Sequence, residues 1–250
     1  MIDGSSIDVV LDAYGPERSA LLRLLERLDV GQWGLATECP AYSVKGIATH
    51  VLGDDLSLLS RQRDEAEQGT SLLAPELPGA AFPTILDTFN DRWVATAAFL
   101  STELLLELLQ LAGDWTEDYY RSVDPMAPGE PVGLFGATQE GTSPFWHAIA
   151  REYLERWTHH SQIRRALGLG SLAEEPFLRV GVEVAAAAAR LEPWIPTEPD
   201  GDWALGPLVL GPAGQTADAL TRAHPAEELR ALVRGPAELV ELFAAVAGRK

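Results

Sequence analysis

The chain has 250 residues, of which 46% are hydrophobic, so it can bury a sizeable core and is not expected to be disordered. Its formal net charge of −18, from 37 acidic and 19 basic residues, repels phosphate backbones and argues against a nucleic-acid partner. The single cysteine, Cys39, excludes an internal disulfide, and we assign it no chemistry. Neither a signal-peptide pattern nor a membrane-spanning apolar run is found, so we expect a soluble cytoplasmic protein.

Four long amphipathic helices are predicted within the first 170 residues. Their ranges are 7–28, 44–68, 83–112 and 143–167. The regular part of the first is expected to begin near Pro16, since proline interrupts a helix. Ser43 is a suitable N-cap for the second, and Gly168 ends the fourth. The Pro- and Gly-rich segment 114–142 is expected to be irregular or to contain a hairpin. This pattern predicts a four-helix bundle.

The rest of the chain has a different pattern. Helices are predicted over 176–191, 227–233 and 236–247, and a strand over 203–210. Prolines separate the first of these helices from the strand. The chain is therefore expected to be mainly α, with a helical bundle over residues 1–172 and a small α/β domain over residues 173–250.

The fourth helix holds the residues most informative about function. At about 100° per residue, Glu152, Glu155 and His159 fall within an arc of about 60°. Glu155 and His159 are four residues apart, so they are neighbours on one face and together can bind a cation. Zinc, nickel, cobalt, iron and manganese all suit such ligands. The alternative is an ordinary surface pair of weak energy.

The other histidines have different expected roles. His160 falls in the middle of the apolar arc, which is typical of a core histidine with one satisfied hydrogen bond. His147 sits at the helix start, where a surface or a capping role is expected, and His224 is assigned no role. A metal site needs a further ligand, and His50 on the second helix is the best candidate. Asp54 follows one turn later, either to orient the ring of His50 or as a solvated acid.

Two segments resemble the signature regions of the mycothiol-dependent maleylpyruvate isomerase family, which is similar to the DinB-like metalloprotein bundles. The segments are CPAYSVKGIATHVLGDD, from Cys39, and EYLERWTHHSQIRRALG, from Glu152. The spacing of Glu155 and His159, with Gly168 nine residues later, matches the family pattern. The chain departs from that pattern at Tyr42, where tryptophan is commoner, and in the three residues that follow His159. These departures are typical of a side branch.

The resemblance implies that His50, Glu155 and His159 bind one divalent metal, with zinc as the first candidate. It further implies that mycothiol is the cosubstrate and that its thiolate attacks an electrophilic substrate, in an isomerase or an S-transferase. Glu152 is a candidate base near the metal, or else a solvent-facing acid. Arg164, with Arg165, is a candidate for holding an anionic substrate, or else a favourable charge at the helix C-terminus.

Two other hypotheses stay open from the sequence. The chain could be a non-catalytic module that binds a metal and a small molecule, or a metal-free helical interaction protein. The oligomeric state, as monomer or dimer, is not predicted.

Overall fold

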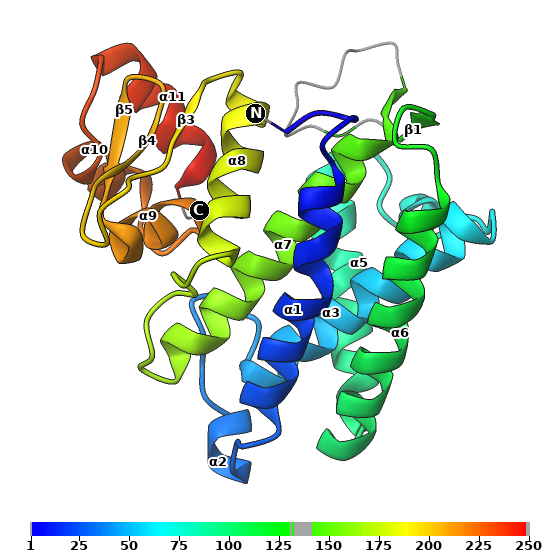
Figure 1. Ribbon diagram of the computed structural model, residues 1–250. Coiled ribbons are helices and arrows are strands. Elements are labelled where there is room, and N and C mark those ends of the chain that lie inside the picture. Colours follow the sequence, from blue (N-terminus) through cyan, green and yellow to red (C-terminus); the bar gives the residue numbers. More distant parts are fainter. Residues whose placement is uncertain (1, 131, 133–141, 249–250) are drawn as a thin grey trace. The chain divides into compact units, whose positions relative to one another are not determined.

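Figure 1 shows the computed structural model of the chain, which describes residues 2–130, 132 and 142–248. The predicted fold class is confirmed, because the chain is mainly helical with a small sheet in its C-terminal part. It divides into two compact units, Arg18–Ser122 and Met1–Glu17 with Val123–Lys250. The predicted domain boundary at residue 172 stays a prediction. None of the helices in the described ranges combines the length and hydrophobicity of a membrane crossing.

Helix α1 (Asp8–Leu25) contributes residues to both units, and it corrects the prediction that regular structure begins near Pro16. The helix starts eight residues earlier and contains the proline. Proline removes one backbone hydrogen bond from a helix interior. Tertiary contacts outweigh this cost here, because Tyr14 is buried and its hydroxyl donates a 2.6 Å hydrogen bond to the carbonyl of Ile149.

In the unit Arg18–Ser122, helix α3 packs against α5 and α6, as Figure 1 also shows. The α-helices after α1 are α2 (Val30–Trp33), α3 (Val44–Leu58), α4 (Gly69–Leu73), α5 (Phe82–Thr96) and α6 (Thr102–Ser122). Shorter helical turns are η1 (Leu59–Arg63), η2 (Ala74–Glu76) and η3 (Ala97–Phe99). The buried side chains of α3 and α6 form most of the core of this unit.

The predicted third helix, 83–112, is wrong, because two helices replace it. The chain breaks after η3, and the hydroxyl of Ser101 accepts a hydrogen bond from the backbone N–H of Leu104, which caps the start of α6. Lys45 on α3 donates to the carbonyls of Ala98 and Leu100 at 2.9 and 2.6 Å, so a tertiary contact satisfies the carbonyls at the break. The second of the two helices continues to Ser122, through residues expected to be irregular.

The second predicted helix begins as expected and ends early. The Oγ of Ser43 accepts from the N–H of Gly46, so the predicted N-cap is confirmed. The helix was expected to reach residue 68, whereas α3 ends at Leu58 and η1 at Arg63. Glu65 then takes a left-handed backbone conformation with φ of 56°, which stops any continuation of the helix.

In the other unit, α7 (Phe145–Ala166) is the longest helix and follows the prediction closely. Strands β1 (Pro128–Gly129) and β2 (Ser143–Pro144) form an antiparallel pair before it. This pairing agrees with the hairpin, one of the two alternatives predicted for 114–142, while residues 131 and 133–141 lie outside the described residues. Gly168 has φ of +75°, as expected for a glycine that ends a helix.

The C-terminal part of this unit contains a three-stranded antiparallel sheet and further helices. Its elements are α8 (Phe177–Ala189), β3 (Pro193–Trp194), β4 (Trp203–Leu205), β5 (Leu208–Gly211), α9 (Ala213–Leu220), α10 (Ala226–Leu232) and α11 (Ala237–Ala247). The single strand predicted over 203–210 is wrong, since β4 and β5 form a hairpin there. Gly206, with φ of +53°, makes the tight turn between them. The three predicted helices are confirmed as α8, α10 and α11.

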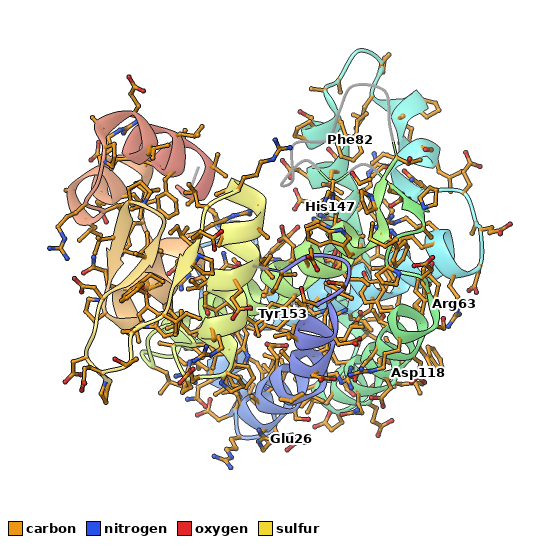
Figure 2. All side chains as sticks on the ribbon, turned by 45° about the horizontal axis from the view of Figure 1, so that its top comes forward. Glu26, Arg63, Phe82, Asp118, His147 and Tyr153 are labelled. Atoms are coloured by element: carbon orange, nitrogen blue, oxygen red, sulfur yellow. The ribbon has the colours of Figure 1, made fainter. Side chains whose placement is uncertain are left out.

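Helix α8, yellow in Figure 1, packs against α7 and against β3 and β4. The indole of Trp157 on α7 is fully buried and donates a 2.8 Å hydrogen bond to the carbonyl of Leu172. Tyr153, labelled on α7 in Figure 2, donates to the carbonyl of Phe177 at 3.1 Å. Gly181 on α8 leaves room for the Trp157 ring. These contacts hold the C-terminal elements on α7.

Candidate metal centre

Helix α7 presents Glu155 and His159 on one face, as their spacing of four residues predicts. The Oε2 of Glu155 lies 3.8 Å from the Nε2 of His159. This separation is too long for a direct hydrogen bond between the two atoms. The residue is 7% exposed, so the orientation of its imidazole is fixed by packing as well as by polar contacts.

The other ring nitrogen of His159 is held by Gln162. Its Nδ1 lies 2.9 Å from the Oε1 of Gln162, one turn further along α7. An amide oxygen accepts hydrogen bonds, so in this orientation of the Gln162 amide Nδ1 is the donor, and Nε2 is the ring nitrogen left for a metal ion. That nitrogen is the one that faces Glu155. Gln162, His159 and Glu155 therefore lie in line along one face of the helix.

Two arginines flank the carboxylate of Glu155. Arg151, one turn earlier on α7, and Arg222, just after α9, each have a guanidinium nitrogen 3.7 Å from Oε1. Arg222 has φ of 59° and its side chain is about half exposed. Both guanidinium groups place positive charge next to the same oxygen of this carboxylate.

The two candidate catalytic residues each form ion pairs. Glu152 is 4% exposed, and its carboxylate pairs with the guanidinium of Arg151. Arg164 pairs with Glu174 at 3.3 Å and donates to the carbonyl of Gly170 at 3.2 Å. These contacts give both residues a structural role.

The predicted roles of the other histidines on α7 can be compared with the structure. His160 is 1% exposed, and its Nδ1 lies 2.7 Å from the Oε1 of Glu17 on α1. The prediction of a core histidine with a satisfied hydrogen bond is confirmed. His147 contacts the ring of Trp146 edge-on, and burial lowers the pKa of its imidazole. His224 makes a pair with Glu228 near the surface.

His50 and Asp54 form a second pair, in the unit Arg18–Ser122. The Nε2 of His50 lies 3.4 Å from the Oδ2 of Asp54, one turn later on α3. Tyr42 stacks on the imidazole with ring centroids 5.7 Å apart and donates a 2.8 Å hydrogen bond to Asp91 on α5. Burial and this hydrogen bond raise the pKa of the Tyr42 phenol well above its ordinary value. Asp54 thus contacts the ring of His50, which is the contact that a role in orienting this ring would require.

Helix α5 also supports the turn of α3 that carries His50. The indole N–H of Trp93 donates to the carbonyl of Thr49 at 2.8 Å. A side chain at Gly53 would collide with that indole, because a Cβ there would lie 2.5 Å from its Cδ1. The glycine lets α5 approach α3 next to the histidine.

The three predicted ligands therefore lie in two carboxylate–imidazole pairs: Glu155 with His159 in one unit, and His50 with Asp54, which was not a predicted ligand, in the other. Sequence reasoning missed Gln162 and the partnership of Tyr42 with Asp91. The position of Gln162, three residues after His159 on the same helix, was a usable signal. Asp91 gave none, since it lies 49 residues from Tyr42 and the pair depends on the packing of α5.

Comparison with known protein families gives one match. The model of the mycothiol maleylpyruvate isomerase N-terminal domain matches residues 14–164, which is more than half of the chain. The chain belongs to this family. The match to the mycothiol maleylpyruvate isomerase N-terminal domain includes both carboxylate–imidazole pairs and Gln162, and it ends before the C-terminal sheet. Searches of curated proteins and of solved structures returned no match.

Proposed function

We propose that the chain is a metal-dependent enzyme that uses mycothiol against an electrophilic substrate, as an isomerase or an S-transferase. In this proposal His50, Glu155 and His159 bind one divalent ion, with zinc the first candidate. The observation that carries it is the line of Gln162, His159 and Glu155 on α7, within the span matched by the family. It places the Nε2 of an imidazole and a carboxylate oxygen on the same side, 3.8 Å apart.

The residues fit a borderline metal by type and by spacing. One carboxylate and two imidazoles are ligands typical of catalytic zinc, and they leave a position for another molecule. Two ligand atoms about 2.1 Å from a tetrahedral zinc ion lie about 3.4 Å apart. The Glu155–His159 and His50–Asp54 separations of 3.8 and 3.4 Å are close to that value. Asp54 is therefore a further candidate ligand beside His50.

When bound, the metal supplies Lewis acidity that favours the thiolate form of mycothiol at neutral pH. The thiolate sulfur then bonds to an electrophilic carbon of the substrate. In an isomerase it adds to one carbon of a cis double bond and leaves the electron pair on the neighbouring carbon. After rotation about the resulting single bond the thiolate leaves and the double bond forms again. In a transferase the sulfur stays attached, and either a halide leaves or the adduct takes up a proton. Arg222 and Arg151 supply positive charge next to Glu155 in a chain of net charge −18, and so favour an anionic substrate.

Metal content of the purified protein tests the site. Wild type is expected to carry about one ion per chain, and His50→Ala and His159→Ala are expected to lose it. His224→Ala is the matched control, because this histidine also pairs with a glutamate four residues away but is not a proposed ligand. Full occupancy in both His50→Ala and His159→Ala would overturn the proposal.

The thiol reaction needs a separate measurement. Metal-loaded protein is incubated with mycothiol and either maleylpyruvate or a chlorobimane, and product is followed against the uncatalysed rate. Turnover that disappears with a chelator supports the enzyme. A rate no higher than the uncatalysed rate, across a panel of thiols and electrophiles, would refute catalysis.

A non-catalytic metal-binding module is the second candidate, and one observation favours it. Both residues proposed as catalytic, Glu152 and Arg164, are engaged in ion pairs. This hypothesis expects mycothiol to bind in a metal-dependent manner without turnover. Titration of mycothiol, followed by calorimetry on the metal-loaded and chelator-treated protein, separates it from the enzyme.

A further inference from the structure

Gln162 is buried, and its place beside His159 suggests a role beyond packing. Its side chain is on α7, the residue is 5% exposed, and its Oε1 faces the imidazole Nδ1 at 2.9 Å. A buried polar group that makes a hydrogen bond of this length restricts the rotation of both side chains. The contact with Gln162 then sets both the plane of the His159 ring and the position of its Nε2.

The direction of this hydrogen bond decides which nitrogen is available to a metal. If Nδ1 were unprotonated, its lone pair would face the lone pairs of the Gln162 oxygen, which is unfavourable. With the amide oxygen directed at the ring, as in the structure, this contact favours the tautomer with hydrogen on Nδ1. A histidine binds a metal through an unprotonated ring nitrogen. A hydrogen-bond acceptor next to the other nitrogen commonly holds the proton there. In this chain the nitrogen on the side of Glu155 is Nε2, which lies 3.8 Å from the Oε2 of that carboxylate.

We propose that Gln162 is a positioning residue for the metal site: it holds His159 in the Nδ1-protonated tautomer, with Nε2 directed toward Glu155. This inference rests on the proposed function, because it assumes that His159 binds a metal. Gln162 itself contacts neither metal nor substrate in this role. It acts through the orientation and proton position of one imidazole.

The amide also differs from a carboxylate in the same position. An amide oxygen is neutral, so it fixes the ring without adding negative charge next to the ligand. A carboxylate partner makes a histidine a more basic and stronger ligand. Gln162 therefore gives orientation while leaving more positive charge on the metal, which favours ionisation of a bound thiol.

The first test needs no metal. Nitrogen-15 NMR of the metal-free protein at about pH 8, above the usual imidazole pKa, reports the tautomer of each histidine. His159 is expected to be protonated at Nδ1 in wild type. In Gln162→Met, which keeps the length of the side chain and removes the acceptor, the two tautomers are expected to mix. A wild-type His159 protonated at Nε2 would overturn the inference.

The second test measures zinc affinity by competition with a chromophoric chelator. Gln162→Met is expected to bind zinc about 10- to 100-fold more weakly than wild type, the range for loss of a partner to a metal ligand. Gln162→Glu, which restores an acceptor, is expected to bind at least as tightly as wild type. Gln110→Leu, an exposed position on α6, is the control and is expected to leave affinity unchanged.

The outcomes separate this inference from the proposed function. If wild type binds no zinc, the proposed metal site falls and the inference falls with it. If wild type binds zinc through His159 and Gln162→Met binds equally well, only the positioning role is overturned. Unfolding midpoints of the variants, measured without metal, identify any loss of affinity that comes from a damaged fold.

Discussion

The buried pair of Glu17 and His160 predicts a strong energetic coupling between α1 and α7. The two residues are each 1% exposed and their polar atoms are 2.7 Å apart. His160→Leu removes the partner of a buried carboxylate, whereas Glu17→Met removes the partner of an imidazole. The double variant replaces both by apolar side chains of similar size. These three proteins and wild type form a double-mutant cycle.

The structure predicts which of the three variants loses most free energy of unfolding. Removing one member of a buried charged pair costs about 3–5 kcal/mol, so His160→Leu is expected to lower the free energy of unfolding by that amount. Glu17→Met leaves a neutral imidazole with one lost hydrogen bond, a cost of about 1–3 kcal/mol. The double variant leaves no charge buried, and its cost is expected to be below that of His160→Leu alone.

Urea unfolding followed by circular dichroism measures the cycle. A chelator is present throughout, so that no bound metal contributes to stability. At about pH 8 a free imidazole is neutral, which keeps the comparison simple. Costs that add within about 0.5 kcal/mol would refute the coupling, because independent sites add to that accuracy.

Three further predictions follow from local geometry. Tyr42→Leu is expected to weaken zinc binding several-fold, measured by chelator competition, because the ring of His50 loses its stacked neighbour. Gly181→Ala is expected to lower the free energy of unfolding by about 1–2 kcal/mol in urea, since its Cβ would lie 2.5 Å from the immobile ring of Trp157 and overpacking outweighs the gain in helix propensity. Burial lowers the pKa of His147, so the unfolded chain binds more protons and stability falls as pH drops through about 6.5. His147→Phe is expected to reduce the loss of Tm between about pH 8 and about pH 5.

Each of these predictions has a control within the chain. Tyr42→Phe keeps the stacked ring and loses only the hydrogen bond to Asp91, so its effect on zinc affinity should be the smaller. Gly214→Ala adds a Cβ to helix α9 with nothing within 4 Å, and it should not destabilise the protein. Equal effects of Gly181→Ala and Gly214→Ala would contradict the packing argument. For His147, an unchanged pH dependence in His147→Phe would show that other groups cause the acid sensitivity.

The sequence by itself determined the helical class and one half of the candidate site. Helix periodicity, the Ser43 cap and the Gly168 terminator are local signals, and the structure contains all three where they were expected. The pairing of Glu155 with His159 follows from a spacing of four residues on a single helix. Local physical chemistry decides such features, since they depend on residues less than two turns apart.

Tertiary structure decided the features that depend on distant residues. The break between α5 and α6 is stabilised by Lys45, more than 50 residues earlier in the chain. No local sequence pattern near Ala97 predicts this break. Pro16 lies inside α1 because buried contacts with α7 outweigh one lost backbone hydrogen bond. Glu17 became the partner of His160 across 143 residues of chain. Contacts of this kind are set by packing, which side-chain periodicity constrains only to a face and not to a partner.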